Sequence, residues 1–430
     1  MQKRFRKDAL FFYRNSSMEE TELIPHLFRT EYRKIVSVLC HLFGIEHIET
    51  AEDIVSDTFL AATELWSIKG LPENPVAWLY TVAKNKTKNY LKRDALFAQK
   101  LAKEIKYSSD LIAELEIDLS PKSIQDSQLA MIFTVCNPCI STEAQIALSL
   151  NLLCGFGIQE IADAFLTNKE VIYKRISRAK EKLKEEQIRI QYPSLAELDS
   201  RLDNVLTTLY LLFNEGYYSR TPEAVLREDL CFEAMRLNYL LIENESTNKP
   251  QVNALLSLMC FHSSRFEARR NENGESVLYD DQDANLWNKE LIDKGVYYLN
   301  MSSRGKIISK YHLEACIAYW HTHKEDTSEK WEHILQLYNQ LLLIEYSPIA
   351  ALNRTFALSK ANGKERAIIE AEKLELTNNP FYFTLLAYLY SEINPAKALL
   401  HYESALLLPV SNADKQVILS NIRKLKEKNF

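Results

Sequence analysis

The chain has 430 residues, of which 47% are hydrophobic and 26% are charged, and its formal net charge is −6. This is the composition of an ordinary globular protein of two to four domains, and the charge excludes a wholly basic nucleic-acid coat but not a local basic surface. Only nine residues are glycine, about 2% against a usual value of about 7%, which argues against turn-rich β architectures and glycine-rich phosphate loops. We therefore expect an all-α protein with long helices and short loops.

The sequence contains no apolar run that approaches the length of about 20 residues needed to span a bilayer. The basic leader, residues 1–20, has an apolar stretch from Ala9 to Tyr13 that is too short for the core of a signal peptide. We therefore expect a cytoplasmic protein with no membrane partner.

The seven cysteines are scattered along the chain, and only Cys136 and Cys139 form a CxxC pair. A zinc site would need a second pair or nearby histidines, and the sequence places neither close by. The cysteines are therefore expected to be small packing residues, and we expect neither a metal site nor a cofactor.

Residues 22–66 are predicted to form two or three helices, because their apolar residues recur at helical spacing. Gly44 is expected to end the first run. The segment 51–66 would bury one side and present an acidic side, on which Asp53 and Asp57 lie one helical turn apart. The polar residues of that side are Glu52, Asp53, Ser56, Asp57 and Glu64.

The next helix is predicted to begin at Pro75, because proline suits the first helical turn. It is strongly basic, and the run 84–106 holds eight lysines and arginines. Asparagines and Tyr90 are interleaved with these cations, a mixture that suits phosphates together with unpaired bases. A solvated charged face is the alternative interpretation. Trp78 is expected in the core rather than on this face.

Residues 107–126 are mixed in character and contain several serines and Pro121, so they are predicted to be a linker. A second helical unit is expected from residue 127. Thr142, followed by Gln145 three residues on, predicts a capping box at the start of one of its helices.

The segment 158–183 carries the strongest local pattern in the sequence. Two apolar faces at helical spacing are separated by a turn of about three residues, which is the geometry of a helix-turn-helix, and Asn168 is expected to cap the second helix. Such a helix buries one side and offers hydrogen-bond donors to DNA from the other. An exposed charged helix in a bundle is the alternative. The outward positions are Lys169, Glu170, Tyr173, Lys174, Ser177, Arg178 and Lys180.

Pro193 marks the next expected boundary, and the rest of the chain is predicted to be helical. A weak repeat near the C-terminus aligns Ala367 with Ala398, an offset close to the tetratricopeptide period of about 34 residues. The acidic segment 279–283 lacks the glycine and glutamate of a calcium loop and is expected to cap a helix. The segment 214–219, NEGYYS, is interpreted as a buried polar hinge.

The order and spacing of these modules resemble extracytoplasmic-function RNA polymerase sigma factors of the sigma-70 family. Within residues 21–185 the resemblance rests on the segments AEDIVSDTFLAATELW, NPVAWLYTVAKNKTKNYLKR and STEAQIALSLNLLCGFGIQEIADAFLTNKEVIYKRISRAKEKL. Downstream, the segments LDNVLTTLYLLFNEGYYS, HLEACIAYW and SPIAALNRTFALSKANG resemble a subgroup whose sigma factors carry a C-terminal tetratricopeptide-like extension.

The resemblance implies an all-α fold with a defined order of domains. The N-terminal half would consist of the basic leader (1–20), sigma region 2 (21–106), the linker (107–126) and sigma region 4 (127–187). A helical extension (193–295) and a tetratricopeptide-like helical domain (296–430) would follow. The chain would bind core RNA polymerase and direct it to promoter DNA, without being an enzyme. The extension would act as a built-in regulatory domain whose partner is a peptide or a protein.

The resemblance also distributes roles among residues. In region 4, Lys174 or Arg178 would contact a base of the −35 element. The residues expected at that element are Lys169, Glu170, Tyr173, Lys174, Arg175, Ser177, Arg178 and Lys180. The residues expected along the −10 element are Asn74, Lys84, Asn85, Lys88, Asn89, Lys92 and Arg93. The residues expected to face the clamp coiled coil of the largest polymerase subunit are Glu52, Asp53 and Asp57.

A one-component transcription regulator is the alternative function. Its helical C-terminal half would sense a ligand or a peptide, and its helix-turn-helix would bind an operator. Such a regulator has no use for an acidic helix and a basic, amide-rich helix before its helix-turn-helix, which favours the sigma factor. The sequence contains no GxxxxGK[ST], HExxH or GxSxG motif, so no catalytic site is expected.

Overall fold

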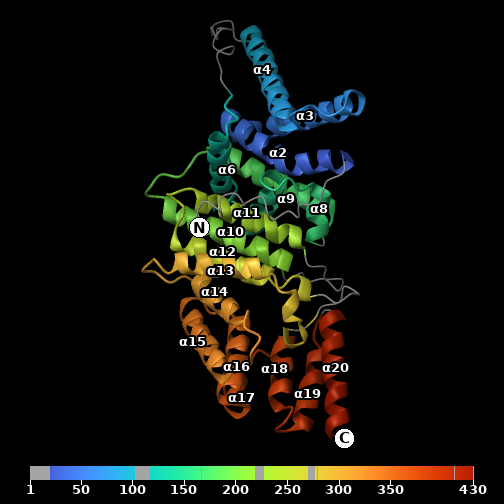
Figure 1. The fold of residues 1–430 in the computed structure, drawn as a ribbon, viewed down its shortest axis with the longest axis vertical. Coiled ribbons are helices and arrows are strands. Elements are labelled where there is room, and N and C mark those ends of the chain that lie inside the picture. The colour runs from blue at the N-terminus through green and yellow to red at the C-terminus, as the bar shows by residue number, and fades with distance from the viewer. Residues whose placement is uncertain are drawn as a thin grey trace. The chain divides into compact units, whose positions relative to one another are not determined.

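The computed structural model describes residues 20–101, 117–165, 167–217, 227–269, 277, 279–410 and 412–429. Within these ranges every regular element is a helix and no strand forms, so the predicted all-α fold class is confirmed (Figure 1). The chain divides into two compact units, Met1–Leu212 and Phe213–Phe430, which are described separately. The predicted basic leader, most of the predicted linker and the end of the basic run lie outside the described residues.

The first unit begins with three helices that pack against one another: α2 (Glu20–Phe43), α3 (Ile48–Lys69) and α4 (Pro75–Leu101). A short 3-10 turn, η2 (Ile45–His47), connects α2 to α3. Gly44 precedes this turn with a φ of +89°, a conformation that favours glycine, and α2 ends there as predicted. The apolar sides of the helices form a core that includes Ile35, Leu39, Val55, Phe59 and Leu79.

Four further helices follow: α6 (Pro121–Val135), α7 (Thr142–Leu152), α8 (Ile158–Ala164) and α9 (Lys169–Glu185). The predicted start of this group at residue 127 is wrong, because α6 begins at Pro121. Ser120 caps the helix by accepting a hydrogen bond from the Ser123 N–H at 3.3 Å, and proline suits the first turn. A Ser-Pro pair is typical of turns as well as of helix starts, which is why the sequence read as a linker.

The predicted capping box of α7 is also wrong by one residue. The N-cap is Ser141, whose Oγ accepts a hydrogen bond from the Ala144 N–H at 3.4 Å. Gln145 does not return to the helix start. Its Nε2 donates instead to the main-chain carbonyls of Asn137 and Ile140, both at 3.0 Å, and so fixes the turn between α6 and α7.

The first part of α10 (Leu198–Tyr217) is anchored on α6 and α7. Thr208 Oγ1 donates to Gln145 Oε1 at 2.7 Å, and both side chains are buried. Arg201 donates to the Phe133 carbonyl. The Phe133 ring also meets the ring of Tyr192, with their centres 5.4 Å apart. The segment that follows the predicted region 4 is therefore bonded to it by specific contacts.

The second unit contains α11 (Glu228–Glu243), α12 (Pro250–Ser263), α13 (Lys289–Ser302) and α14 (Lys310–Trp320). Helix α12 is central, because it packs against the other three. Its approach to α13 depends on Gly295, where a Cβ atom would lie 2.5 Å from the Phe261 ring. Three 3-10 turns connect α12 to α13: η3 (Glu267–Arg269), η4 (Tyr279–Asp281) and η5 (Ala284–Leu286).

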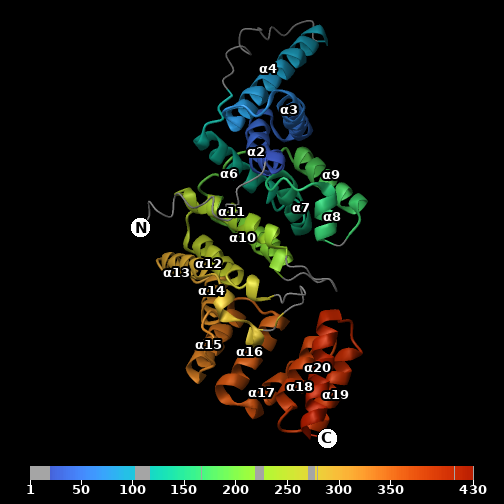
Figure 2. The same cartoon turned by 45° about the vertical axis from the view of Figure 1, so that its right-hand side comes forward.

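The rest of the second unit is a row of helices in which each packs against the next (Figures 1 and 2). They are α15 (Ser328–Ile344), α16 (Pro348–Asn362), α17 (Lys364–Glu372), α18 (Pro380–Tyr390), α19 (Pro395–Leu406) and α20 (Asn412–Asn429). Ala367 in α17 and Ala398 in α19, which the weak repeat aligns, are both fully buried. Their equal burial fits a repeated hairpin, and the assignment to a tetratricopeptide-like domain stays a prediction.

Two short motifs acquire structural roles. The Asp283 side chain accepts a hydrogen bond from the Asn285 N–H at 2.9 Å and caps η5, as predicted. In NEGYYS, of which Tyr218 and Ser219 lie outside the described residues, Gly216 permits close packing at the end of α10. A Cβ atom on Gly216 would lie 2.7 Å from the Arg227 carbonyl oxygen. The glycine therefore lets α10 approach the start of α11.

Candidate nucleic-acid and polymerase interfaces

The predicted polymerase-binding face lies on α3. Ile54 and Val55 turn into the core, whereas Asp53 and Asp57 are exposed on the opposite side. Near the Asp57 carboxylate lies Lys86 of α4, whose Nζ is 3.8 Å away. This pair is largely solvated, so it leaves the Asp57 charge available to a partner.

Helix α4 presents its predicted −10 residues along one exposed stripe. Asn85, Asn89 and Lys92 are exposed and recur at helical spacing, with Arg93 beside them, while Lys84 and Lys88 are half-buried. Trp78, earlier in the same helix, is half-buried and packs edge-on against Trp66, with ring centres 5.3 Å apart. Trp78 thus packs against the buried Trp66, but it is half-buried and not a core residue as expected.

Asn74 has a structural function that the sequence did not reveal. Its Oδ1 accepts a hydrogen bond from the Ala77 N–H at 3.0 Å and so caps α4, which begins at Pro75 as predicted. The side chain is exposed, but its oxygen is already engaged. A substitution of Asn74 would therefore disturb the start of α4 as well as any contact with DNA.

Helices α8 and α9 form the predicted pair of helices, and only four residues separate them in the sequence. The Asn168 Oδ1 accepts a hydrogen bond from the Val171 N–H at 2.9 Å, which confirms this residue as the N-cap of α9. Ile172, Ile176 and Leu183 are buried at helical spacing. Arg175 is half-buried, and the exposed predicted −35 residues are Lys169, Glu170, Tyr173, Lys174, Ser177 and Arg178.

The expectation that Lys180 lies on the outward side of α9 is wrong. Lys180 is only 8% exposed, and its Nζ lies 2.7 Å from Glu52 Oε2 of α3. One turn further along, Lys184 Nζ lies 2.9 Å from Glu49 Oε2. These ion pairs join the C-terminal half of α9 to the start of the acidic helix. Lys180 and Glu52, assigned to DNA and to polymerase, thus neutralise each other within the first unit.

The ion pair between Lys184 and Glu49 affects the pKa of the Glu49 carboxyl group. Burial acts to raise the pKa of Glu49, but the hydrogen bond from Lys184, a backbone hydrogen bond and the charges of Lys184 and Lys180 together outweigh it, so that the pKa lies below its usual value. The Glu49 carboxylate is therefore ionised at neutral pH. The contact between α9 and α3 is accordingly one between charged groups.

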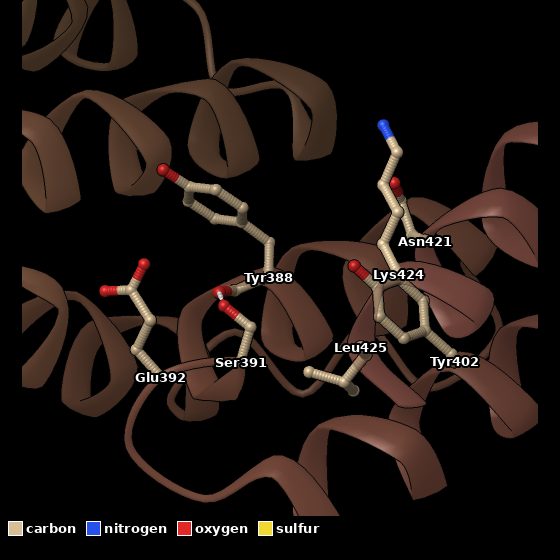
Figure 3. A pocket seen from close by; sticks show the side chains of 7 residues that line it. All are labelled: Tyr388, Ser391, Glu392, Tyr402, Asn421, Lys424 and Leu425. Atoms are coloured by element: carbon tan, nitrogen blue, oxygen red, sulfur yellow. Dashed lines mark hydrogen bonds between the residues drawn. The ribbon is translucent and has the colours of Figure 1, made fainter. Parts of the chain in front are cut away.

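A pocket of about 200 Å³ lies where α18, α19 and α20 meet, and no sequence pattern had pointed to it (Figure 3). Several of its polar groups already have partners. Glu392 forms an ion pair with Lys364 at 3.2 Å, and Ser391 Oγ donates to the Tyr388 carbonyl at 2.7 Å. The lining residues are Tyr388, Ser391, Glu392, Tyr402, Asn421, Lys424 and Leu425.

The described helices include none that is both long enough and apolar enough to cross a membrane. Comparison with protein families matches residues 27–96 to sigma-70 region 2. This segment contains α3 and most of α4, the two helices that carry the acidic face and the basic stripe. The N-terminal part of the chain is therefore a sigma-70 region 2 domain, which supports a sigma-70 family factor and implies binding to core RNA polymerase.

A second match covers residues 201–303, which resemble a family of unknown function (DUF6596). The chain is also 32% identical, over 343 residues, to "Uncharacterized protein R00370" of Rhizobium meliloti (strain 1021). The aligned region covers 78% of this chain and 80% of the rhizobial protein. The chain belongs to the same protein family as that protein. No solved structure matches it.

Proposed function

We propose that the chain is a sigma factor of the extracytoplasmic-function type, which binds core RNA polymerase and directs it to promoters. The observation that carries the proposal is the match of residues 27–96 to sigma-70 region 2. The exposed carboxylates of Asp53 and Asp57 support it, because charges of this kind steer assembly with a basic partner and set its register.

The two basic helices would divide promoter recognition between them. The exposed stripe of α4 would hold the −10 element, where Asn85 and Asn89 offer hydrogen bonds to unpaired bases among cations that attract the phosphates. The exposed N-terminal half of α9 would enter the major groove at the −35 element, with Lys174 or Arg178 in contact with a base. Lys180 is not assigned to DNA, because it is buried and paired with Glu52.

The ion pairs between α9 and α3 support a closed form of the factor. In this form the Glu52 charge is neutralised by Lys180, and the C-terminal half of α9 is held against region 2. Promoter elements at −35 and −10 lie more than two turns of DNA apart, so the two modules must separate to reach both. Opening would expose the charges of Glu52 and Lys180 together.

A one-component regulator remains the second candidate, and one experiment separates the two functions. Purified full-length chain is mixed with core polymerase and passed through a sizing column, and promoter DNA is tested with and without polymerase. A sigma factor comigrates with core polymerase and binds its promoter strongly only in that complex. Strong sequence-specific binding to DNA by the chain alone, without comigration, would support the regulator.

The second unit would regulate the factor, with a peptide or a protein as its partner. Two truncations test this role. A chain that ends after Glu186 loses the bonds of Arg201 and Thr208 to α6 and α7, whereas one that ends after Tyr217 keeps them. The chain that ends after Tyr217 should stay folded, because it keeps these bonds. If the second unit regulates the factor, promoter-dependent transcription by this shorter chain should differ strongly from that of the full chain. Equal transcription by the shortened and the full chain, both with and without cell extract, would contradict the regulatory role.

A further inference from the structure

The second unit contains a group of cations and aromatic rings that the proposed function does not use. The group, here called the arginine–aromatic cluster, is contributed by the end of α10, by α12 and the turns that follow it, and by the residue after α14. Its members are Tyr217, His262, Arg265, Arg269, Tyr279 and His321. Most of them lie in the part of the chain that matches the family of unknown function.

The two guanidinium groups of the cluster converge on Tyr217. Arg269 Cζ lies 4.0 Å from the centre of the Tyr217 ring, and Arg265 Nη2 lies 3.3 Å from its hydroxyl oxygen. The Arg269 N–H donates to the Arg265 carbonyl at 3.1 Å, so one turn of backbone places the two side chains on the same side. Arg265 also lies over the Tyr279 ring, 5.4 Å from its centre.

These arginines differ from the other half-buried arginines of the second unit. Arg227, Arg236 and Arg354 each have a carboxylate partner, at 2.9, 2.7 and 3.7 Å. In the described part of the chain, no carboxylate lies within ion-pair distance of Arg265 or Arg269. A partly buried positive charge without a counter-ion is costly, and two such charges side by side also repel each other.

The surroundings of the pair increase this cost. The Phe213 ring stacks on Tyr217 at 5.7 Å and the Trp287 ring stacks on Tyr279 at 6.2 Å, so the guanidinium groups lie against apolar surface. Within the described residues, Arg265 Nε and His321 Nδ1 are buried and have no hydrogen-bond partner. Buried polar atoms are nearly always bonded in folded proteins, so these two mark a place where a partner is expected.

The histidines of the cluster respond to its positive charge. Burial, with the charges of Arg265 and Arg269, holds the pKa of His262 well below its usual value. Burial, with the charges of Arg265 and Lys330, lowers the pKa of His321 to about 3. Both rings are therefore neutral near pH 7, where each can offer one N–H, and the charge of the cluster resides on the guanidinium groups.

We propose that the arginine–aromatic cluster binds the phosphate group of a small phosphorylated compound. Two guanidinium groups present paired N–H donors that fit phosphate oxygens, and their charge balances a phosphate monoester, at about −2, better than a single carboxylate. The His321 N–H supplies a further donor in one tautomer. Inorganic phosphate and organic phosphate monoesters share this chemistry.

The test is a calorimetric titration of the full-length chain with inorganic phosphate and, separately, with O-phosphoserine, at constant ionic strength. At least one of them should bind saturably, and Arg265→Gln and Arg269→Gln should each weaken that binding at least tenfold. Arg304→Gln is the matched control, because Arg304 is an exposed arginine of the same unit and its loss removes the same charge. Stronger binding of O-phosphoserine would identify an organic monoester as the ligand, and equal binding would indicate phosphate itself.

Two results overturn the proposal: no saturable binding of either compound, or weak binding that sulfate reproduces equally, which would mark an adventitious ion only. If the glutamine variants fail to fold, Arg269→Lys takes their place, because lysine keeps the charge but lacks the paired donors. Weaker binding by that variant supports the proposal, and native binding contradicts it. The cluster lies in the second unit, so its failure would leave the proposed promoter function intact.

Discussion

Helices α4 and α9 are the two basic helices of the first unit, and they use their cations differently. In α4 the predicted DNA-binding residues form no ion pair among the described residues, and the neighbouring Lys86 pairs only loosely with Asp57, at 3.8 Å. In α9 the first half is exposed, whereas Lys180 and Lys184 are bound to Glu52 and Glu49 of α3. Basic residues at helical spacing are thus available to DNA in α4 and in the first half of α9, whereas in the second half of α9 they form internal ion pairs.

This difference shows what helical periodicity can and cannot predict. Periodicity identifies the side of α9 that packs on its own neighbours, and it correctly places Ile172 and Ile176 in the core. It carries no information on a carboxylate that lies 128 residues earlier in the chain, as Glu52 does relative to Lys180. Substitutions in the exposed half of α9 should therefore weaken promoter binding, whereas substitutions in the paired half should lower the stability of the first unit.

The largest effect is expected in the exposed half of α9. The variant Lys174→Ala with Arg178→Ala should lose about 3 kcal/mol of promoter-binding free energy, roughly 100-fold in affinity, because one base contact and one phosphate contact are removed. The measurement is binding of the polymerase complex to promoters that differ at single −35 positions. Lys182→Ala, an exposed lysine that pairs with Glu186, serves as control. Unchanged affinity and preference would refute the assignment.

The next effect concerns the paired half of α9. Glu52→Gln should lower the free energy of unfolding of the first unit by about 2 kcal/mol, because the buried ammonium of Lys180 loses its counter-charge. Lys180→Met in the same chain should recover most of this loss, since it removes the unpaired charge. Urea denaturation of the two single variants and the double variant measures the coupling. Additive losses would mean that the ion pair does not stabilise the closed form.

A smaller effect is expected at the exposed acidic face of α3. Asp53→Lys with Asp57→Lys should weaken binding to core polymerase by about 1 kcal/mol, roughly fivefold, while the fold is preserved because both side chains are exposed. Glu143→Lys, at an exposed position of α7 in the same unit, is the control for charge alone. Native binding by the double variant would remove this face from the interface.

The smallest effect is expected at Glu49, whose ion pair with Lys184 is largely solvated. Glu49→Gln should cost at most about 0.5 kcal/mol at neutral pH. The folded pKa of Glu49 is lowered, so its contribution to stability is present above the usual carboxyl value of 4.5 and is lost as the pH falls through the folded pKa. Urea denaturation should therefore separate the variant from the native chain near neutral pH, and the difference should shrink as the pH is lowered below 4.5. A difference that stays constant as the pH falls would contradict this account.

The sequence predicted those features that depend on neighbouring residues. The end of α2 at Gly44, the start of α4 at Pro75 and the cap of α9 at Asn168 all follow from local backbone chemistry. The start of α6 at Pro121 was missed because a Ser-Pro pair fits a turn and a helix start equally well. The cap at Ser141 was assigned one residue too late, because serine and threonine are both good caps.

The features that the sequence could not predict depend on residues that are distant in the chain. The Lys180–Glu52 ion pair and the bond from Thr208 to Gln145 each join two helices. The same is true of the arginine–aromatic cluster, whose residues come from separate elements between Tyr217 and His321. Arg265 and Arg269 look like ordinary surface residues in the sequence, and only the packing of Tyr217 and Tyr279 against them reveals an unusual pair.

The central claim is that this chain directs RNA polymerase to promoters, and run-off transcription tests it most directly. Purified full-length chain is added to core polymerase with a template library, and the transcript ends are mapped. We predict transcripts from a defined set of start sites, each preceded by shared −10 and −35 sequences, which disappear when the chain is omitted. Transcripts that do not depend on the chain, or that begin at random positions, would contradict the claim.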